Sequence, residues 1–462
     1  MNLAGPPEPV FGLQELQEYA ERFSTVHLDE YIEQLRNSER TPHPKEINDA
    51  LWGTIGLSAA EVALLDSPLL QRLRYIRQLG VVHWVYPGAI HTRFEHSLGV
   101  LFQVRHIASA LNNVASSALI DQDHVQLLRL CALLHDTGHA AFSHVSEMAM
   151  EAVQAIAPLS NAFSTEQRVE ARHLSEMFAY YVIKSGAMRK LIELMIDRSW
   201  LTVRFAADRA TNVKTTIDKL ANAIIGKKID DRVPLMHELI SGPFDADKLD
   251  YFMRDAQLAG TPSVLDISRL VQKLTVRSFD ASELPEEIGR NVNRQDRHWL
   301  VGVKWSGIAV LDELHLARVL LFAKIYRHPK VVAIEQMLRS VVLTLSHLIP
   351  PNKVVEFLYT YPDDALVWMT KESLRSALGI ADSRINDEID GRLRSAAETL
   401  KDLRERRLWQ RALQMHSRYP ADPREAVKQQ KQGLIEFLEE VEHPQQRTAF
   451  VSDMLDEVKC IN

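Results

Sequence analysis

The sequence has little of what marks disulfide-rich, membrane-spanning or secreted proteins. Its two cysteines, Cys131 and Cys460, cannot form a disulfide framework, and Cys131 lies in an apolar stretch where a small core residue is expected. No apolar run reaches the length of a membrane span, and the N-terminal MNLAGPPEPVFG lacks a basic segment followed by an apolar core. We therefore expect a cytoplasmic protein that is neither secreted nor inserted in a membrane.

An excess of basic residues is also absent, because the formal net charge is −7. This charge argues against nucleic acid as a partner, since broad adhesion needs Lys and Arg gathered on one face. A local basic pocket for a nucleotide is still allowed. The 462 residues are 46% hydrophobic, which permits a substantial core and a soluble globular protein of two or three domains.

Histidine is concentrated in one part of the chain, where nine of the 18 histidines fall between His83 and His173. The stretch LRLCALLHDTGHAAFSHVSE, residues 128–147, reads as a buried helix that ends in His135 and Asp136. An isolated His-Asp pair is more often a solvated or salt-bridged helix face. Here HTRFEHSLGV adds His96 and FDADKLDYFMRD adds Asp247. Two imidazoles and two carboxylates suit a divalent cation and leave ligand positions for water and a phosphate oxygen.

The motifs HTRFEHSLG, LLHDTGHAAFSH and DADKLDYFMRD, in this order, resemble the HD-domain phosphohydrolases and, within them, the deoxynucleoside triphosphate triphosphohydrolases. The resemblance runs roughly from Leu51 to Met337. It implies a mainly α-helical fold, with a helical HD-domain core, minor β-hairpin elements and a helical C-terminal region. We divide the chain into an N-terminal helical arm (1–50), the HD-domain catalytic core (51–349) and the C-terminal region (350–462).

The resemblance also implies a reaction, namely hydrolysis of a deoxynucleoside triphosphate to deoxynucleoside and tripolyphosphate. A divalent metal ion, Mg, Mn or Fe in preference to Zn, would be held by His96, His135, Asp136 and Asp247. Homo-oligomers, dimers or tetramers, are typical of the family, and some members are activated by a nucleotide. Asp66, Gln71 and Arg74 match positions that bind a guanine nucleotide activator in vertebrate members, although the same segment could instead form an oligomer interface.

A second pair of residues suggests proton transfer. Glu147 follows His144 by three positions, which places carboxylate and imidazole on one helix face, where the carboxylate can orient the ring and raise its basicity. The resemblance makes His144 the general acid with Glu147 as its partner, and it places His139 and His173 in the same pocket. A helix-surface position is the alternative for His173. Gly138 and the alanines after it would let the backbone approach a ligand closely.

Substrate contacts come from several segments. Asp247, Tyr251 and Asp255 lie four residues apart and therefore line one stripe of a helix. The resemblance assigns Gln78, Tyr251 and Asp255 to the sugar, with Tyr251 excluding a ribose 2′-hydroxyl. It further assigns Arg93, Lys248 and Arg318 to the phosphates, and Tyr326 to the base. The structural alternatives are a surface salt bridge for Arg93, a surface position for Arg318 and a core tyrosine at Tyr326.

The hydropathy pattern predicts helices over most of the chain, with proline and glycine at their ends. Expected helices are amphipathic segments within residues 13–40, Pro68 to Leu79 after an Asp66-Ser67 cap, a helix from near Phe94, several within 180–240, one entered through Pro243, one long helix from LDELHLARV to VAIEQML, and charged C-terminal helices such as LRSAAETLKDLRERRLWQRAL. Expected strands are a hairpin in VVHWVYPG and the segments LTVRSF and HWLVGVKWSGIAVL. Asp245 and Asp250 would only complement a helix dipole.

Two other functions fit the same residues. Another HD phosphohydrolase, acting on a cyclic or alarmone nucleotide, would keep the metal ligands but release different products. Cyclic-dinucleotide phosphodiesterases of this superfamily typically have HDXGK, whereas His139 stands here in place of the lysine. The third alternative is a nucleotide sensor or nucleic-acid-binding module with a non-catalytic HD site. The complete ligand set and the His144–Glu147 pair favour an enzyme.

Overall fold

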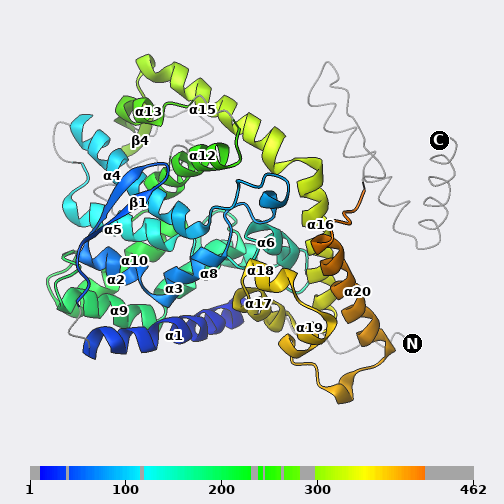
Figure 1. Cartoon of the computed structure of the whole chain (residues 1–462). Coiled ribbons are helices and arrows are strands. Elements are labelled where there is room, and N and C mark those ends of the chain that lie inside the picture. Colours follow the sequence, from blue (N-terminus) through cyan, green and yellow to red (C-terminus); the bar gives the residue numbers. More distant parts are fainter. Residues whose placement is uncertain are drawn as a thin grey trace. The chain divides into compact units, whose positions relative to one another are not determined.

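A computed structural model describes residues 11–37, 41–114, 119–229, 238–242, 245–261, 265–280 and 297–410, without the side chains of 297–299 (Figure 1). Apart from Gln410, these residues belong to one compact unit, Met1–Trp409. The second unit is Gln410–Asn462, and its residues 411–462 lie outside the described residues, as do the predicted GLIEFLEEVEHP segment and Cys460. Among the described helices, none combines the length and apolar character needed to cross a membrane. The division at residues 50 and 349 remains a prediction.

The fold is mainly helical, and its described strands form two small antiparallel sheets. The elements up to the HD turn and the three helices after it are α1 (Leu13–Asn37), β1 (Lys45–Asp49), β2 (Gly53–Leu57), α2 (Ala59–Leu65), α3 (Pro68–Gln71), the 3-10 helices Arg72–Tyr75 and Val82–Trp84, α4 (Arg93–Val114), α5 (Gln122–Leu134), α6 (His144–Glu151), α7 (Leu159–Gln167) and α8 (Leu174–Lys184).

The remaining elements complete the unit. They are α9 (Gly186–Asp197), α10 (Arg209–Ile224), α11 (Glu238–Ser241), α12 (Ala246–Leu258), α13 (Ile267–Lys273), β3 (Leu274–Asp280), β4 (Arg297–Val303), the 3-10 helix Trp305–Gly307, α15 (Ile308–Leu321), the π-helix Phe322–Tyr326, α16 (Pro329–Ser346), α17 (Pro351–Thr360), α18 (Asp363–Val367), α19 (Lys371–Ala377), the 3-10 helix Asp382–Arg384 and α20 (Asp387–Arg404).

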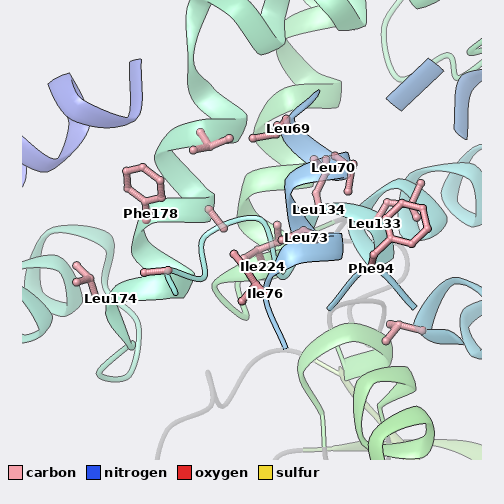
Figure 2. Packing of buried hydrophobic residues seen from close by; sticks show 14 of the residues in the cluster. Leu69, Leu70, Leu73, Ile76, Phe94, Leu133, Leu134, Leu174, Phe178 and Ile224 are labelled. Atoms are coloured by element: carbon pink, nitrogen blue, oxygen red, sulfur yellow. The ribbon is translucent and has the colours of Figure 1, made fainter. Parts of the chain in front are cut away.

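The helix that leads to the HD pair is buried, as predicted. Asp121 caps α5 by accepting a hydrogen bond from the backbone N–H of His124, and Cys131 is fully buried. Leu133 and Leu134, immediately before His135, belong to the same core as Leu69 and Ile224 of other elements (Figure 2). This packing fixes the end of α5, and it therefore fixes where the next two residues, His135 and Asp136, begin.

The N-terminal helix packs on the core. Helix α1 runs along α8 and α9 (Figure 1). Its buried side chains follow helical spacing and include Leu16, Tyr19, Phe23 and Leu28. The predicted amphipathic segment therefore forms a single long helix that contributes one wall of the core.

The helix predicted from Pro68 to Leu79 is shorter than expected. It begins as predicted, with Ser67 as the N-cap and Pro68 in the first turn, but α-helical geometry ends at Gln71 and a 3-10 turn follows. Ile76 is extended, and its carbonyl accepts a hydrogen bond from the N–H of Arg93. The prediction of the helix end was wrong because the backbone at this point pairs with the start of α4.

The hairpin predicted in VVHWVYPG is also wrong. The segment contains a 3-10 helix, Val82–Trp84. In a strand, successive side chains point to opposite faces, but Val81 and Val82 are both buried in the core. A tight turn allows both valine side chains to enter the core. The segment belongs to a loop that leads to Thr92, which forms an isolated β-bridge with Arg77.

Two hairpins are present elsewhere. Strands β3 and β4 pair antiparallel, which confirms the strand expected in LTVRSF and the first half of the one expected in HWLVGVKWSGIAVL. The prediction was wrong for the second half, which forms the 3-10 helix Trp305–Gly307 and the start of α15. The β1–β2 hairpin was not predicted, although its three-residue connection has recognisable features. Asp49 accepts hydrogen bonds from the N–H groups of Leu51 and Trp52, and Gly53 adopts a φ of 70°, which favours glycine.

The long helix predicted from LDELHLARV to VAIEQML is divided. Helix α15 ends in the π-helix Phe322–Tyr326, and α16 begins at Pro329. Proline has no N–H for a helical hydrogen bond, and it disfavours helical geometry in the residue before it, here His328. Arg318, in α15, and Tyr326, in the π-helix, both precede this break, and their shared face stays a prediction.

Candidate metal centre and its cavity

Three segments bring the predicted metal ligands together. Nε2 of His96, on α4, lies 2.8 Å from Oδ1 of Asp247, on the first turn of α12. Nε2 of His135, the C-cap of α5, lies 3.3 Å from Nε2 of His96 and 3.9 Å from Oδ1 of Asp247. One ligand atom from each of these three residues lies within 4.8 Å of the others.

The fourth predicted ligand, Asp136, borders this cluster. Its Oδ2 lies 3.8 Å from Nε2 of His96, and its Oδ1 lies 3.4 Å from Nε2 of His135. Nη1 of Arg93 lies 2.8 Å from Oδ2 and forms a buried ion pair with it. This ion-paired oxygen lies beside the cluster.

The ring of His96 is held from behind by a carboxylate that the sequence analysis had assigned to the helix dipole. Oδ2 of Asp250 lies 2.8 Å from Nδ1 of His96, so the assignment of Asp250 was wrong. A Cβ built on Gly99 would lie only 1.8 Å from Oδ1 of Asp250, so the glycine of HTRFEHSLG leaves the space for this carboxylate. Asp245, in contrast, caps α12 as expected, by accepting from the N–H of Lys248.

Asp250 is itself fixed by a buried network. It accepts hydrogen bonds from Nε and Nη2 of Arg254, at 2.8 and 3.0 Å, and from Nε1 of Trp52. Arg254 also lies 3.0 Å from Asp49 at the end of β1. The unpredicted β1–β2 hairpin therefore helps to orient a metal-ligand candidate, as partners beyond the ligands commonly do.

The electrostatics of the cluster favour a cation. Burial lowers the pKa of His96, but hydrogen bonds to Asp247 and Asp250 outweigh burial and raise that pKa to about 10. Burial likewise raises the pKa of Asp247, and the hydrogen bond from His96 brings it below its ordinary value. The position between these groups therefore stabilises positive charge. Imidazole nitrogens and carboxylate oxygens, including those of Asp136, form a donor set that fits a divalent ion.

Next to the cluster lies the predicted proton-transfer pair. Nδ1 of His144 lies 2.9 Å from Oε2 of Glu147, and both belong to α6. The other oxygen of Glu147 accepts hydrogen bonds from the N–H and the hydroxyl of Ser175, at 2.8 and 2.6 Å. Burial raises the pKa of Glu147, but these contacts lower it to about 2, so the carboxylate is ionised at neutral pH. The role of Ser175 was not predicted, because it lies on another helix.

The other two pocket histidines differ in environment. His139 is buried, with Nε2 at 3.5 Å from Oδ1 of Asp136 and its ring 5.0 Å from that of His144. Burial, with nearby Arg93, lowers its pKa well below the ordinary value, so the ring is neutral. His173 is exposed at the start of α8, where it contacts Glu151 at 3.2 Å, and this hydrogen bond raises its pKa to about 9.

A polar cavity of about 350 Å³ opens beside these groups. Its lining combines the candidate ion ligands with cationic, aromatic and proton-transfer side chains. These residues include Gln78, Arg93, His135, Asp136, His139, His144, His173, Asp247, Lys248 and Tyr251. The cavity therefore contains most of the site that the sequence motifs predict.

Comparison with known proteins agrees with this arrangement. Residues 93–200 match the HD domain family, a range that includes His96, the HD pair at 135–136 and the His144–Glu147 pair. The chain contains an HD domain. Asp247 lies beyond the matched range and joins the site through tertiary packing.

The similarity of this chain to other proteins extends beyond residues 93–200. An uncharacterized protein of Methanocaldococcus jannaschii is 28% identical over 350 residues, which cover 75% of this chain and 58% of the relative. The human deoxynucleoside triphosphate triphosphohydrolase SAMHD1 is 27% identical over 271 residues, which cover 58% of this chain and 40% of the relative. An uncharacterized protein of Mycoplasma pneumoniae is 29% identical over 215 residues, which cover 46% of this chain and 42% of the relative. The matches thus span 40% to 58% of these three relatives' lengths.

Arg93 of the HD domain is buried, which contradicts the surface salt bridge considered as its alternative. Its Nε donates to the hydroxyl of Ser143 at 2.8 Å. Its Nη2 is buried and has no hydrogen-bond partner within the described part of the chain. Oε1 of Gln78 is also buried and unpartnered among these residues. Both atoms belong to side chains that line the cavity.

The remaining predicted contacts of the HD-domain protein are less direct. Asp255, Arg318 and Tyr326 are not among the residues that line the cavity. Asp255 is buried and accepts from the hydroxyl of Tyr326 at 2.5 Å, and His91 lies 2.9 Å from its other oxygen. Arg318 is exposed, with its guanidinium 5.8 Å from the ring of Phe322.

The three predicted activator positions lie outside the cavity and have internal partners. Asp66 accepts from Lys45 at 2.6 and 2.9 Å, and Nε of Arg74 donates to Oε1 of Gln71 at 2.8 Å. The guanidinium of Arg74 also lies 3.6 Å above the ring of Phe94.

Gly138 has a different neighbour from the ligand that was expected. A Cβ at this position would lie 1.9 Å from the carbonyl oxygen of Ser175. The glycine therefore lets the loop at residues 136–143, the HD loop, pack directly on α8. This packing brings Ser175 within reach of Glu147.

Proposed function

We propose that this HD-domain protein is a metal-dependent phosphohydrolase that converts deoxynucleoside triphosphates to deoxynucleoside and tripolyphosphate. The observation that carries the proposal is the convergence of His96, His135 and Asp247 within 4.8 Å, beside a cavity lined by His144 and by two cations, Arg93 and Lys248. The name of the human relative adds the substrate class, since that protein is a deoxynucleoside triphosphate triphosphohydrolase.

His96, His135, Asp136 and Asp247 would hold the divalent ion, with Mg, Mn or Fe favoured over Zn because two of the four ligands are carboxylates. When bound, such an ion supplies Lewis-acid polarisation of a phosphate oxygen and makes water more acidic. Asp250 keeps the ring of His96 in one orientation through the 2.8 Å contact at Nδ1.

His144 would donate a proton to the departing 5′-oxygen of the nucleoside. Its exposed ring lines the cavity, and the ionised Glu147 holds Nδ1 at 2.9 Å, which leaves Nε2 to face a ligand. A positioned acid of this kind contributes about 10²–10⁴-fold to a reaction. The neutral His139 and the protonated His173 would complete the polar wall around the leaving group.

Arg93 and Lys248 would offset the charge of the triphosphate. The unpartnered Nη2 of Arg93 suits a phosphate oxygen, because guanidinium groups bind such oxygens in a directed way. Lys248 now donates to Oδ2 of Asp245 at 2.5 Å and to the carbonyl of Gly242 at 2.9 Å, so it would exchange one of these partners for phosphate. Arg318 would reach the phosphates from α15 only if the ligand extends beyond the cavity.

Gln78 and Tyr251 would contact the sugar, because both line the cavity and Oε1 of Gln78 has no partner among the described residues. Tyr251 is the residue proposed to exclude a ribose 2′-hydroxyl. For Asp255 and Tyr326, contact with the sugar and the base requires their mutual hydrogen bond to open. Their roles stay predictions that follow from the resemblance.

Product analysis tests the reaction. Protein loaded with Mg, Mn or Fe would be incubated with each deoxynucleoside triphosphate, separately and in mixtures, and followed by phosphorus NMR and chromatography. Tripolyphosphate with free deoxynucleoside supports the proposal, and addition of EDTA should abolish both products. Pyrophosphate or monophosphate products, or turnover of cyclic and alarmone nucleotides alone, would indicate another HD phosphohydrolase. Binding without turnover would indicate a sensor.

We also propose that the protein forms homo-oligomers and that a nucleotide activates it. Activity restricted to nucleotide mixtures would support activation. Substitution of Asp66, Gln71 or Arg74 should then raise the activating concentration and leave the Kd for metal unchanged. Light scattering with and without nucleotide would report the oligomeric state.

A further inference from the structure

The loop between His139 and His144 is held in an unfavourable backbone conformation. Phe142 and Ser143 have φ angles of 59° and 54°, in the left-handed region that non-glycine residues rarely adopt. Both residues are buried. Neighbouring groups must therefore maintain this conformation, because the loop itself does not favour it.

The groups that hold the loop come from the C-terminal part of the described chain. Oδ1 of Asp363 accepts a hydrogen bond from the N–H of Phe142 at 2.7 Å. The carbonyl of Leu358 accepts from the N–H of Ala141 at 3.1 Å, and the hydroxyl of Tyr359 donates to the carbonyl of Gly138 at 2.6 Å. Residues 358–363 thus bind the backbone of the HD loop, residues 136–143, at positions 138, 141 and 142.

Asp363 also holds a second segment of the cavity wall. Its Oδ2 accepts from the N–H of Arg77 at 2.9 Å, and Arg77 precedes Gln78 in the chain. The hydroxyl of Ser143 completes the connection by donating to the carbonyl of Arg77 at 2.7 Å. One carboxylate, only 1% exposed, therefore joins the backbone before Gln78 to the backbone before His144.

We propose that Asp363 is a positioning residue that sets the place of His144 relative to the metal cluster and to Gln78. Hydrogen bonds from two backbone N–H groups to an ionised carboxylate are strong and directional. A displacement of about 1 Å in a reacting group can cost about 10²-fold in rate. The C-terminal region then contributes to the reaction without touching the substrate. We call the hydrogen bonds of Asp363 to Phe142 and Arg77 the clamp. Its effect on turnover rests on the proposed function, but its effect on the loop can be measured separately.

Asp363→Asn tests the clamp with little change in volume. The amide keeps one acceptor oxygen and turns its nitrogen toward a backbone donor, so one of the two N–H groups loses its partner. We expect kcat to fall about 10- to 100-fold, with KM and the Kd for Mn²⁺ within threefold of the wild type. Hydrogen exchange of residues 138–144, followed by mass spectrometry, should become at least several-fold faster.

Asp364→Asn is the matched control, because it removes the same charge one position later. The side chain of Asp364 is 72% exposed, and among the described residues it hydrogen-bonds only to the guanidinium of Arg77, at 2.9 and 3.2 Å. The control should leave both kcat and exchange in 138–144 unchanged. Wild-type kcat and exchange in Asp363→Asn, or equal effects in both variants, would overturn the proposal.

A second variant covers the case in which Asp363→Asn does not fold. Tyr359→Phe removes only the hydroxyl that binds the Gly138 carbonyl, and it should also accelerate exchange in 138–144 and lower kcat. Unchanged values would overturn the clamp. If the wild-type protein hydrolyses no deoxynucleoside triphosphate, the proposed function fails, whereas the exchange measurement still decides whether Asp363 holds the loop.

Discussion

Nδ1 of His96 lies 2.8 Å from Oδ2 of Asp250, although 154 positions separate the two residues in the chain. This contact fixes the ring so that Nε2 faces Asp247 and His135. A carboxylate behind a metal-binding imidazole sets its tautomer and strengthens it as a ligand. Asp250 is itself held by Arg254 and Trp52, so the orientation extends back to the β1–β2 hairpin.

Asp250→Asn should weaken metal binding by about 10- to 100-fold. Asparagine keeps the volume of the side chain but loses the charge that favours a proton on Nδ1 of His96. Titration calorimetry with Mn²⁺ measures the effect, and circular dichroism verifies folding. Asp312→Asn, which changes an exposed carboxylate on α15, is the control. A folded Asp250→Asn protein with wild-type affinity would remove Asp250 from the metal centre.

His144→Gln should lower kcat by about 10²–10⁴-fold, the contribution of a positioned general acid. The Kd for Mn²⁺ should not change, since His144 is not one of the proposed ligands. The matched control is His106→Gln, because His106 is an exposed histidine of α4 whose Nδ1 contacts the carbonyl of Phe102. Full turnover in His144→Gln with normal metal content would show that another group provides the proton.

Glu147→Gln should change how stability depends on pH. Burial disfavours the charged carboxylate, but His144 and Ser175 lower its pKa to about 2, against an ordinary value of about 4.3 in an unfolded chain. A depressed pKa stabilises the fold above about pH 4.3, and this stabilisation disappears as the pH falls toward 2. Its full size is on the order of 3 kcal/mol.

Urea unfolding between pH 7 and 2.5 measures this difference. The free energy of unfolding of the wild type should fall more steeply below pH 5 than that of Glu147→Gln. Glu398→Gln, on the exposed face of α20, should follow the wild type. Parallel pH profiles for wild type and Glu147→Gln would mean that the contacts of Glu147 do not favour its charged form.

Tyr251→Ala should reduce discrimination between dATP and ATP. If the ring excludes the 2′-hydroxyl, the wild type should prefer dATP in kcat/KM, and removal of the ring should narrow the ratio by about tenfold or more. Rates with both nucleotides, measured at equal metal concentration, give the ratio. Equal wild-type rates on dATP and ATP would refute the assignment of Tyr251.

Local patterns in the sequence predicted much of the site. The apolar run before His135 predicted a buried helix that ends at the HD pair, and α5 confirms it. The three-residue spacing of His144 and Glu147 predicted their contact, because residues one helical turn apart share a face. Such predictions need only backbone geometry within one element.

Other features required the packed structure. The hairpin predicted in VVHWVYPG failed because Val81 and Val82 are both drawn into the core, and the helix after Pro68 ends early because Ile76 pairs with Arg93. Asp250 resembled an ordinary acidic residue near a helix start. One signal was nevertheless present, since Asp250 follows Asp247 by three residues and therefore lies near it on α12.

The residues capable of binding a metal and transferring a proton could be named from their types and spacing alone, because imidazole and carboxylate chemistry does not depend on the fold. Which of them meet was decided by packing. His96 reaches Asp247, Ser175 reaches Glu147 and Asp363 reaches Phe142 through contacts between separate helices and loops. No local spacing encodes those distances, since each depends on how the buried faces of the helices fit together.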